Sequence, residues 1–488
     1  MLRTLWPKSS DRQARTGPDG GGMSIAEHNR RSRQAAELDP SLAELITSVM
    51  KRYVVPGLAL GLHSDGQQWL HGFGLTSVEN PLPIDANTTF VAGSITKTVV
   101  ATTVTCLVDR RELELDLPIR TYLPDLNLAD ESVASAVTLR HLMTHSAGWA
   151  GDDFPDADFG LGDDALARAI ASFRNRPQVF PLGSLWSYNN SGFWLAGRVI
   201  EVVTGMSLEA AITKLIFEPL GMANSFFFES DAITRRVAVG HIVGEGGNLT
   251  VARPWSTARA HHAAGGMLTT IADLIAYARF HLGNGLAGDG TRVLTARALH
   301  SMQEPQLPAA GPEFAGIGWV VRDLAGHRVL SHGGDWNGQQ GLITLVPDRN
   351  LAIGSLANSG QARSANDAIA AWALRRYVGS SYPEPVPIEH DDERLDALVG
   401  RYALPSNSIE IARRGNRLGI SYLPSGRPAM NNPVVPEQPA ALTTEGRIVV
   451  LEGPFEGVTG DFSIGPDTWV EWVRLGGRVY PRQSHAPG

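Results

Sequence analysis

Ser94 and Lys97 stand three residues apart in the segment Ser94-Ile95-Thr96-Lys97, and together they could perform nucleophilic chemistry. Residues at positions i and i+3 lie on one face of a helix, so the lysine ammonium would reach the serine hydroxyl. A serine hydroxyl is a weak nucleophile until a base takes its proton, and a lysine whose pKa is lowered by burial can help to take it. The alternative is an ordinary surface pair, because this spacing also arises by chance. Only four of the 42 basic residues are lysines, which favours a specific role for Lys97.

Tyr188 and Asn190, in the segment Tyr188-Asn189-Asn190, could supply the rest of such a site. A tyrosine beside the Ser–Lys pair could act as a general base and then return the proton to the leaving group. Asn190 could hydrogen-bond both the lysine and a substrate amide. Taken alone, the segment is better explained as an aromatic loop residue followed by a turn asparagine.

The third candidate segment is Ser331-His332-Gly333-Gly334-Asp335, which closes a predicted strand. Glycines let another molecule approach a strand backbone closely. A backbone N–H here could complete an oxyanion hole with the N–H of Ser94. Taken alone, the segment is better explained as the glycine-kinked end of a strand.

The elements that would position these residues follow from hydrophobic periodicity and turn residues. The pattern is strands, then a long helical insert, then strands and a closing helix. This order favours an α+β fold in which an antiparallel sheet is flanked by helices and carries a helical subdomain. We predict helices over residues 40–52, 96–112, 269–281 and 368–377, and strands over 57–63, 67–74, 317–322, 328–332, 341–346 and 351–357.

Beyond a linker at residues 380–392, which is rich in proline and acidic residues, short predicted strands recur between turn residues. This spacing is typical of a small all-β sandwich or barrel. The chain therefore divides into a flexible N-terminal tail (1–39), a catalytic region (40–379), the linker, and a small β-barrel-like domain (393–488). We predict the strands of the last domain over residues 408–412, 418–422, 447–451, 459–464 and 468–474.

In order and spacing, the three motifs resemble the class C β-lactamase-like family of serine hydrolases, which includes DD-peptidases, D-aminopeptidases, esterases and some acyltransferases. The resemblance covers roughly residues 45–375. It extends to Leu139–Gly148 and to Ala264–Thr270, which is followed by Ala272-Asp273-Leu274. It implies a β-lactamase/transpeptidase-like fold. It also implies that the appended domain resembles the β-barrel domains of D-aminopeptidases and related members. A loop of this domain could reach the catalytic cleft and narrow the range of substrates. Alternatively, the domain could serve only packing or dimerisation.

Carried over by position, the resemblance implies that Ser94 is the acylated serine and Lys97 its partner. Tyr188 would be the base and acid, and Asn190 would contact the lysine and the substrate.

The same resemblance makes Ser94 and Asp335 the donors of the oxyanion hole, with Gly333 and Gly334 beside them. His332 stands where β-lactamases of this type usually have lysine, as in D-aminopeptidases and related peptidases. This departure puts efficient β-lactam hydrolysis in doubt. Because histidine titrates near neutral pH, we expect His332 to make the activity sensitive to pH in that range.

Composition restricts the partners of the chain. Its 488 residues are 43% hydrophobic and 19% charged, with a net charge of −8, so a basic surface for nucleic acid or for an anionic membrane is not expected. The single cysteine, Cys106, falls in an apolar helical stretch and is interpreted as a core residue, so a disulfide or a cysteine metal site within the chain is excluded. We expect no metal and no organic cofactor, and no hydrophobic export or membrane segment, which makes the cytoplasm the default location.

The sequence thus predicts a serine hydrolase that cleaves an amide in a small peptide, including one that contains D-amino acids, or an ester. A carboxylesterase and an acyltransferase with the same residues remain alternatives. From another class, the chain could be a penicillin-binding sensor that is acylated without turnover. A homo-oligomer stays open. Specificity is expected to lie in loops of the helical insert, such as residues 149–162, whose shape a single sequence does not give.

Overall fold

The computed structural model of the protein describes residues 37–151, 159–244, 247–255, 257–388, 392–424, 436–464 and 470–483. Most of the predicted N-terminal tail, part of the linker and part of the 149–162 loop therefore lie outside the described residues. The division of the chain into domains at the stated boundaries stays a prediction.

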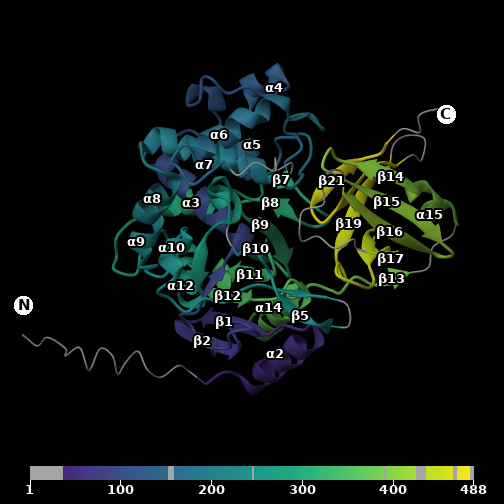
Figure 1. The fold of residues 1–488 in the computed structure, drawn as a ribbon, viewed down its shortest axis with the longest axis horizontal. Helices are drawn as coiled ribbons and strands as arrows, with labels where there is room; N and C mark the ends of the chain where they lie inside the picture. Colours follow the sequence, from purple (N-terminus) through teal and green to yellow (C-terminus); the bar gives the residue numbers. More distant parts are fainter. Residues whose placement is uncertain are drawn as a thin grey trace, which may run out of the picture. The chain divides into compact units, whose positions relative to one another are not determined.

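The main sheet is antiparallel and, within the described part of the chain, has eight strands in the order β2-β1-β12-β11-β10-β9-β8-β7 (Figure 1). The first predicted hairpin pairs with the last strand predicted before the linker, since β1 runs against β12 from Leu58 opposite Ala357 to Ser64 opposite Leu351. The helical residues between them form an insert, as the sequence pattern indicates. The bounds are β1 Gly57–Ser64, β2 Gln67–Gly74, β7 Leu307–Pro308, β8 Phe314–Ala315, β9 Val320–Leu324, β10 His327–Trp336, β11 Gln339–Val346 and β12 Leu351–Ala357.

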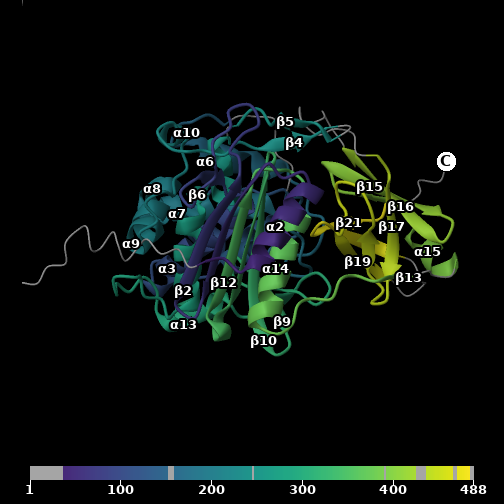
Figure 2. The same ribbon diagram turned by 90° about the horizontal axis from the view of Figure 1, so that it is seen from below.

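Two helices that are distant in sequence, α2 and α14, cover one face of this sheet (Figure 2). α2 (Pro40–Arg52) begins where the sequence predicts, because Asp39 accepts a hydrogen bond from the Ser41 N–H and proline occupies the first turn. α14 spans Arg363–Tyr377 and so begins five residues before its predicted start at 368. Apolar residues of both helices share a core with β1 and β12.

The opposite face packs against helices of the insert in a larger core. α3 (Thr96–Asp109) and α12 (Ile271–Leu282) are central to it. α3 ends before the predicted residue 112, since Arg111 adopts a left-handed φ of 62°. In the described residues, the other α-helices of the insert are α4 Glu131–Ala136, α5 Leu139–Met143, α6 Ala165–Ala171, α7 Asn190–Thr204, α8 Leu208–Ile212, α9 Glu218–Leu220, α10 Glu229–Ala232, α11 His262–Gly265 and α13 Ala296–Met302.

The C-terminal region forms a second antiparallel sheet with its own apolar core. In the described residues this sheet has nine strands: eight run in order from β14 to β21, and β13 (Pro387–Ile388) pairs with β17. The sheet is nearly closed, because Tyr402 in β14 bridges Arg482 just after β21. This confirms the predicted barrel-like all-β region. The bounds are β14 Gly400–Ala403, β15 Asn407–Arg414, β16 Arg417–Pro424, β17 Gln438–Thr443, β18 Ile448–Val450, β19 Thr459–Ile464, β20 Val470–Leu475 and β21 Arg478–Pro481.

The sequence does not predict four strands of this sheet, β13, β14, β17 and β21, and β13 falls within the predicted linker. β17 contains Pro439 and β21 ends at Pro481, and proline within a short run argues against a strand. A short helix, α15 (Asp392–Leu398), precedes β14. None of the helices in the described residues is long and apolar enough to cross a membrane.

Candidate active site

A tight turn between β3 (Thr89–Val91) and α3 presents Ser94. Gly93 in this turn has a left-handed φ of 54°, and a Cβ there would lie 2.5 Å from the backbone nitrogen of Asp335. Glycine is therefore required both by the backbone conformation and by the close approach of β10. The Thr96 hydroxyl donates to the Gly93 carbonyl at 2.7 Å and closes the turn at the start of α3.

Lys97 is fully buried on the first turn of α3, and its ammonium points at Ser94. Lys97 Nζ donates to Ser94 Oγ at 2.9 Å and to the carbonyl oxygen of Ala264 at 2.5 Å. It also lies 4.9 Å from the centre of the Tyr188 ring and 5.6 Å from that of Phe193. A buried cation is tolerated only where acceptors and aromatic faces replace water. The structure thus brings together Ser94, Lys97 and Tyr188.

Tyr188 lies just before α7, and His145 stacks on its ring at a centroid distance of 4.3 Å. His145 Nδ1 accepts from the Asn189 N–H at 3.0 Å, so in the neutral ring the proton is on Nε2. Burial, together with the positive charge of Lys97, holds the pKa of His145 well below its usual value. His145 is therefore a neutral platform beneath the tyrosine. Asn190 is the first residue of α7, two residues after Tyr188.

His332 is buried in β10 and faces the same site, with its ring 6.3 Å from that of Tyr188. Its Nδ1 donates to the Gly333 carbonyl at 2.7 Å, which leaves Nε2 as an acceptor. Burial and the charge of Lys97 lower the pKa of His332 to about 4. The expectation that His332 titrates near neutral pH is therefore wrong, because the protein disfavours the charged imidazole.

The strand β10 packs directly on the turn that carries Ser94. A Cβ on Gly334 would lie 1.9 Å from the Ala92 carbonyl oxygen, whereas a Cβ on Gly333 would meet nothing closer than 3.8 Å. This contact holds the backbone of Ser94 beside that of Asp335. Although the Asp335 side chain reaches solvent, the surrounding protein desolvates its carboxyl and raises its pKa; Gln340, which donates to it at 2.8 Å, opposes this shift.

The hairpin turn between β20 and β21 contacts the segment that carries Tyr188. The Gly477 carbonyl accepts from the Tyr188 N–H at 2.8 Å, and the Val479 N–H donates to Ser187 Oγ at 3.1 Å. The guanidinium of Arg478 lies 4.9 Å from the centre of the Tyr188 ring. The all-β region is thus in direct contact with a candidate catalytic residue.

Sequence reasoning missed the Ala264 carbonyl, His145 as a neighbour of Tyr188, and the turn at Gly477. A carbonyl contact and a turn 289 residues away leave no mark in a single sequence, whereas the Leu139–Gly148 segment could have drawn attention to His145. Cys106 is buried, as predicted, and burial raises the pKa of its thiol to about 12.

Comparison with known proteins identifies the family of the chain. Residues 42–376 match the family model described as Beta-lactamase. Penicillin-binding protein 4 of Amycolatopsis lactamdurans is 32% identical, covering 74% of this chain and 96% of that protein. The D-aminopeptidase of Gluconobacter oxydans is 28% identical over 86% of this chain and 78% of its own length.

Among solved structures, SurE with D-Leu has a TM-score of 0.69 at 24% identity and covers 91% of this chain and 99% of its own. At that identity the likeness concerns the fold, and it extends over both sheets. The α+β prediction with an appended all-β region is therefore confirmed. The protein belongs to the beta-lactamase family and is a serine hydrolase of that family.

Proposed function

We propose that Ser94 is the acylated nucleophile of this enzyme. The observation that carries the proposal is Lys97, a fully buried lysine whose ammonium donates to Ser94 Oγ at 2.9 Å and lies against the Tyr188 ring. A cation held here favours a deprotonated or polarised Tyr188. Tyr188 then takes the proton of Ser94 as the general base.

The proposed reaction has two steps. Ser94 Oγ attacks an amide or ester carbonyl, and the resulting oxyanion is held by the backbone N–H groups of Ser94 and Asp335. The oxyanion then collapses, and the C–N or C–O bond to the leaving group breaks as Tyr188 returns the proton to that group, which leaves the acyl-enzyme. Water then attacks the acyl-enzyme, with Tyr188 acting in reverse. Asn190 contacts the substrate, and His332 stays neutral and offers Nε2 as an acceptor. No metal or organic cofactor takes part in these steps.

We propose a small peptide as the substrate, with the scissile amide next to a D-amino acid. The relatives that match most of the chain support this choice, since one is a D-aminopeptidase and another was solved with D-Leu. An ester, or transfer to an acceptor other than water, would use the same residues.

A second candidate is a penicillin-binding sensor that is acylated and does not turn over. The observation in its favour is the 32% identity to a penicillin-binding protein. The sensor and the hydrolase differ only in whether the acyl-enzyme is hydrolysed. A measurement of substrate turnover therefore decides between them.

The test is to incubate the protein, beside Ser94→Ala, with a fluorophosphonate or a fluorescent penicillin, with p-nitrophenyl acetate, and with D-alanine p-nitroanilide. Labelling and turnover that both require Ser94 support the hydrolase, and the better substrate decides between esterase and aminopeptidase. Labelling without turnover supports the sensor. A folded protein with neither activity rejects the role proposed for Ser94.

The C-terminal region, residues 393–488, is proposed to narrow substrate choice. The contacts of Gly477 and Arg478 with Tyr188 support this. Arg478→Met should alter the ratio of kcat/KM between the anilide and the ester; an unchanged ratio would favour a packing or dimerisation role. A cytoplasmic location and a homo-oligomer are likewise proposals, to be tested by cell fractionation and light scattering.

A further inference from the structure

The carbonyl oxygen that holds Lys97 belongs to a very short helix. Ala264 lies in α11, which has four residues, His262–Gly265, and follows the 3-10 turn Arg259–His261. One helical turn is not stable by itself. The position of the Ala264 carbonyl, and with it the direction of the Lys97 ammonium, therefore depends on what anchors this segment.

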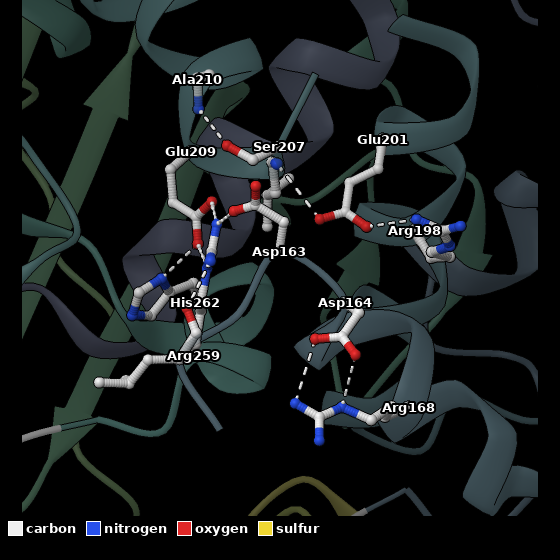
Figure 3. Close-up of polar contacts among 12 residues, drawn as sticks. Asp163, Asp164, Arg168, Arg198, Glu201, Ser207, Glu209, Ala210, Arg259 and His262 are labelled. Carbon is white, nitrogen blue, oxygen red and sulfur yellow. Dashed lines mark hydrogen bonds and ion pairs between the residues drawn. The ribbon is translucent and has the colours of Figure 1, made fainter. Parts of the chain in front are cut away.

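A buried carboxylate, Glu209 of α8, anchors it (Figure 3). Glu209 accepts from His262 Nδ1 at 2.7 Å and from two nitrogens of Arg259 at 3.1 Å each. The side chains of Glu209 and His262 are 7% and 4% exposed, so these bonds lie out of solvent. Burial alone would raise the pKa of Glu209, but the hydrogen bonds from His262 and Arg259 lower it to about 2. The carboxylate is therefore charged at neutral pH.

The rest of the segment is also fixed, but by backbone and packing contacts. The Met267 N–H donates to Thr96 Oγ1 at 3.1 Å, which ties its far end to the start of α3. Ala263 packs against Gly197 of α7, where an added Cβ would lie 2.8 Å from the Ala263 Cβ.

Arg259 is also held by Asp163 at 2.7 Å and by the Leu161 carbonyl at 2.6 Å. Glu209 is the buried group that binds both Arg259 and His262, and His262 lies two residues before Ala264.

We propose that Glu209 is a positioning residue for catalysis: by binding Arg259 and His262 it fixes α11 and so aims the Ala264 carbonyl at Lys97. The inference rests on the role proposed above for Lys97. It assigns to this charged cluster a purpose beyond holding the helices of the insert together.

The test is Glu209→Gln, which keeps the shape of the side chain and removes its charge. With p-nitrophenyl acetate as the substrate, kcat should fall about 10- to 100-fold, because Lys97 acts in the chemical step and a displacement near 1 Å costs about that much. KM should change by less than about threefold, since no substrate contact is removed. His262→Gln should reproduce the loss, and the double variant should lose little more, as expected for residues in one network.

Glu201→Gln is the matched control. Glu201 is a second buried carboxylate, with 8% of its side chain exposed. It pairs with Arg198 and accepts from the N–H of Leu208, the residue before Glu209, whereas Arg259 and His262 bind Glu209 (Figure 3). It should leave kcat unchanged even where it lowers Tm. The inference is overturned if Glu209→Gln lowers kcat no more than Glu201→Gln does, or if KM rises as much as kcat falls.

Two further measurements keep the test decisive. If Glu209→Gln does not fold, His262→Gln is compared with Glu201→Gln on the same criteria. Ser94→Ala, measured in parallel, separates failure of the proposed function from failure of the role proposed for Glu209. Hydrolysis that survives Ser94→Ala rejects the proposed function itself, whereas Ser94-dependent hydrolysis that is indifferent to Glu209→Gln rejects only the role of Glu209.

Discussion

Gly334→Ala should disable the enzyme while leaving it folded. An added Cβ would lie 1.9 Å from the Ala92 carbonyl oxygen. An ordinary carbon–oxygen contact is about 3.4 Å, so β10 and the Ser94 turn must separate by about 1.5 Å. That separation moves the backbone N–H of Asp335 away from that of Ser94. Loss of one oxyanion donor costs about 100- to 1000-fold in rate, and we expect kcat/KM to fall by that factor.

The loss of stability should be smaller than the loss of activity. Overpacking of this kind costs about 1–3 kcal/mol, which lowers Tm by a few degrees. The assay is kcat/KM for p-nitrophenyl acetate together with Tm from circular dichroism. Gly333→Ala is the control for stability, because its Cβ would meet nothing closer than 3.8 Å, and it should keep the wild-type Tm. Wild-type kcat/KM in Gly334→Ala would refute the proposed oxyanion geometry.

Three other predictions concern the site and its surroundings. His332 and His281 are buried with pKa values lowered to about 4 and about 3. In the unfolded chain these two histidines take up protons near pH 6.5, whereas in the folded protein they stay neutral at that pH. The free energy of unfolding should therefore fall as the pH drops from 6.5 to 4, by up to about 3 kcal/mol per pH unit for the pair. A Tm that stays constant from pH 7 to 4.5 would contradict this. Gly477 has a left-handed φ of 81°, and an added Cβ would lie 3.1 Å from the Trp186 ring. Gly477→Ala should therefore shift Tyr188 and lower kcat about tenfold in steady-state kinetics. An unchanged kcat would mean that the hairpin does not position the tyrosine. The Cys106 thiol, with its pKa raised to about 12, should not react with a disulfide reagent at pH 8 until the protein unfolds, and rapid labelling of the native protein would contradict its burial.

Much of the fold could be predicted because local signals agreed with it. The Asp39-Pro40 start of α2 and the Ser64–Gly66 turn of the first hairpin carry their structures in adjacent residues. The Ser94–Lys97 contact could also be predicted, since both residues lie on one helical turn. The neutral state of His332 could not, because it depends on burial by residues that come from other parts of the chain. The same holds for Ala264, whose carbonyl lies 167 residues from Lys97.

Since Tyr188 is proposed as the general base, its contact with Gly477 would make activity depend on two separate apolar cores. The helical face of the main sheet and the C-terminal barrel can melt at different temperatures, since each has its own buried cluster. When the barrel opens, Tyr188 loses a backbone partner even if the main sheet stays intact. The working temperature of the enzyme would then be limited by the less stable of the two cores, and heat inactivation would precede global unfolding. Stabilising the catalytic core alone would then not raise the temperature of heat inactivation.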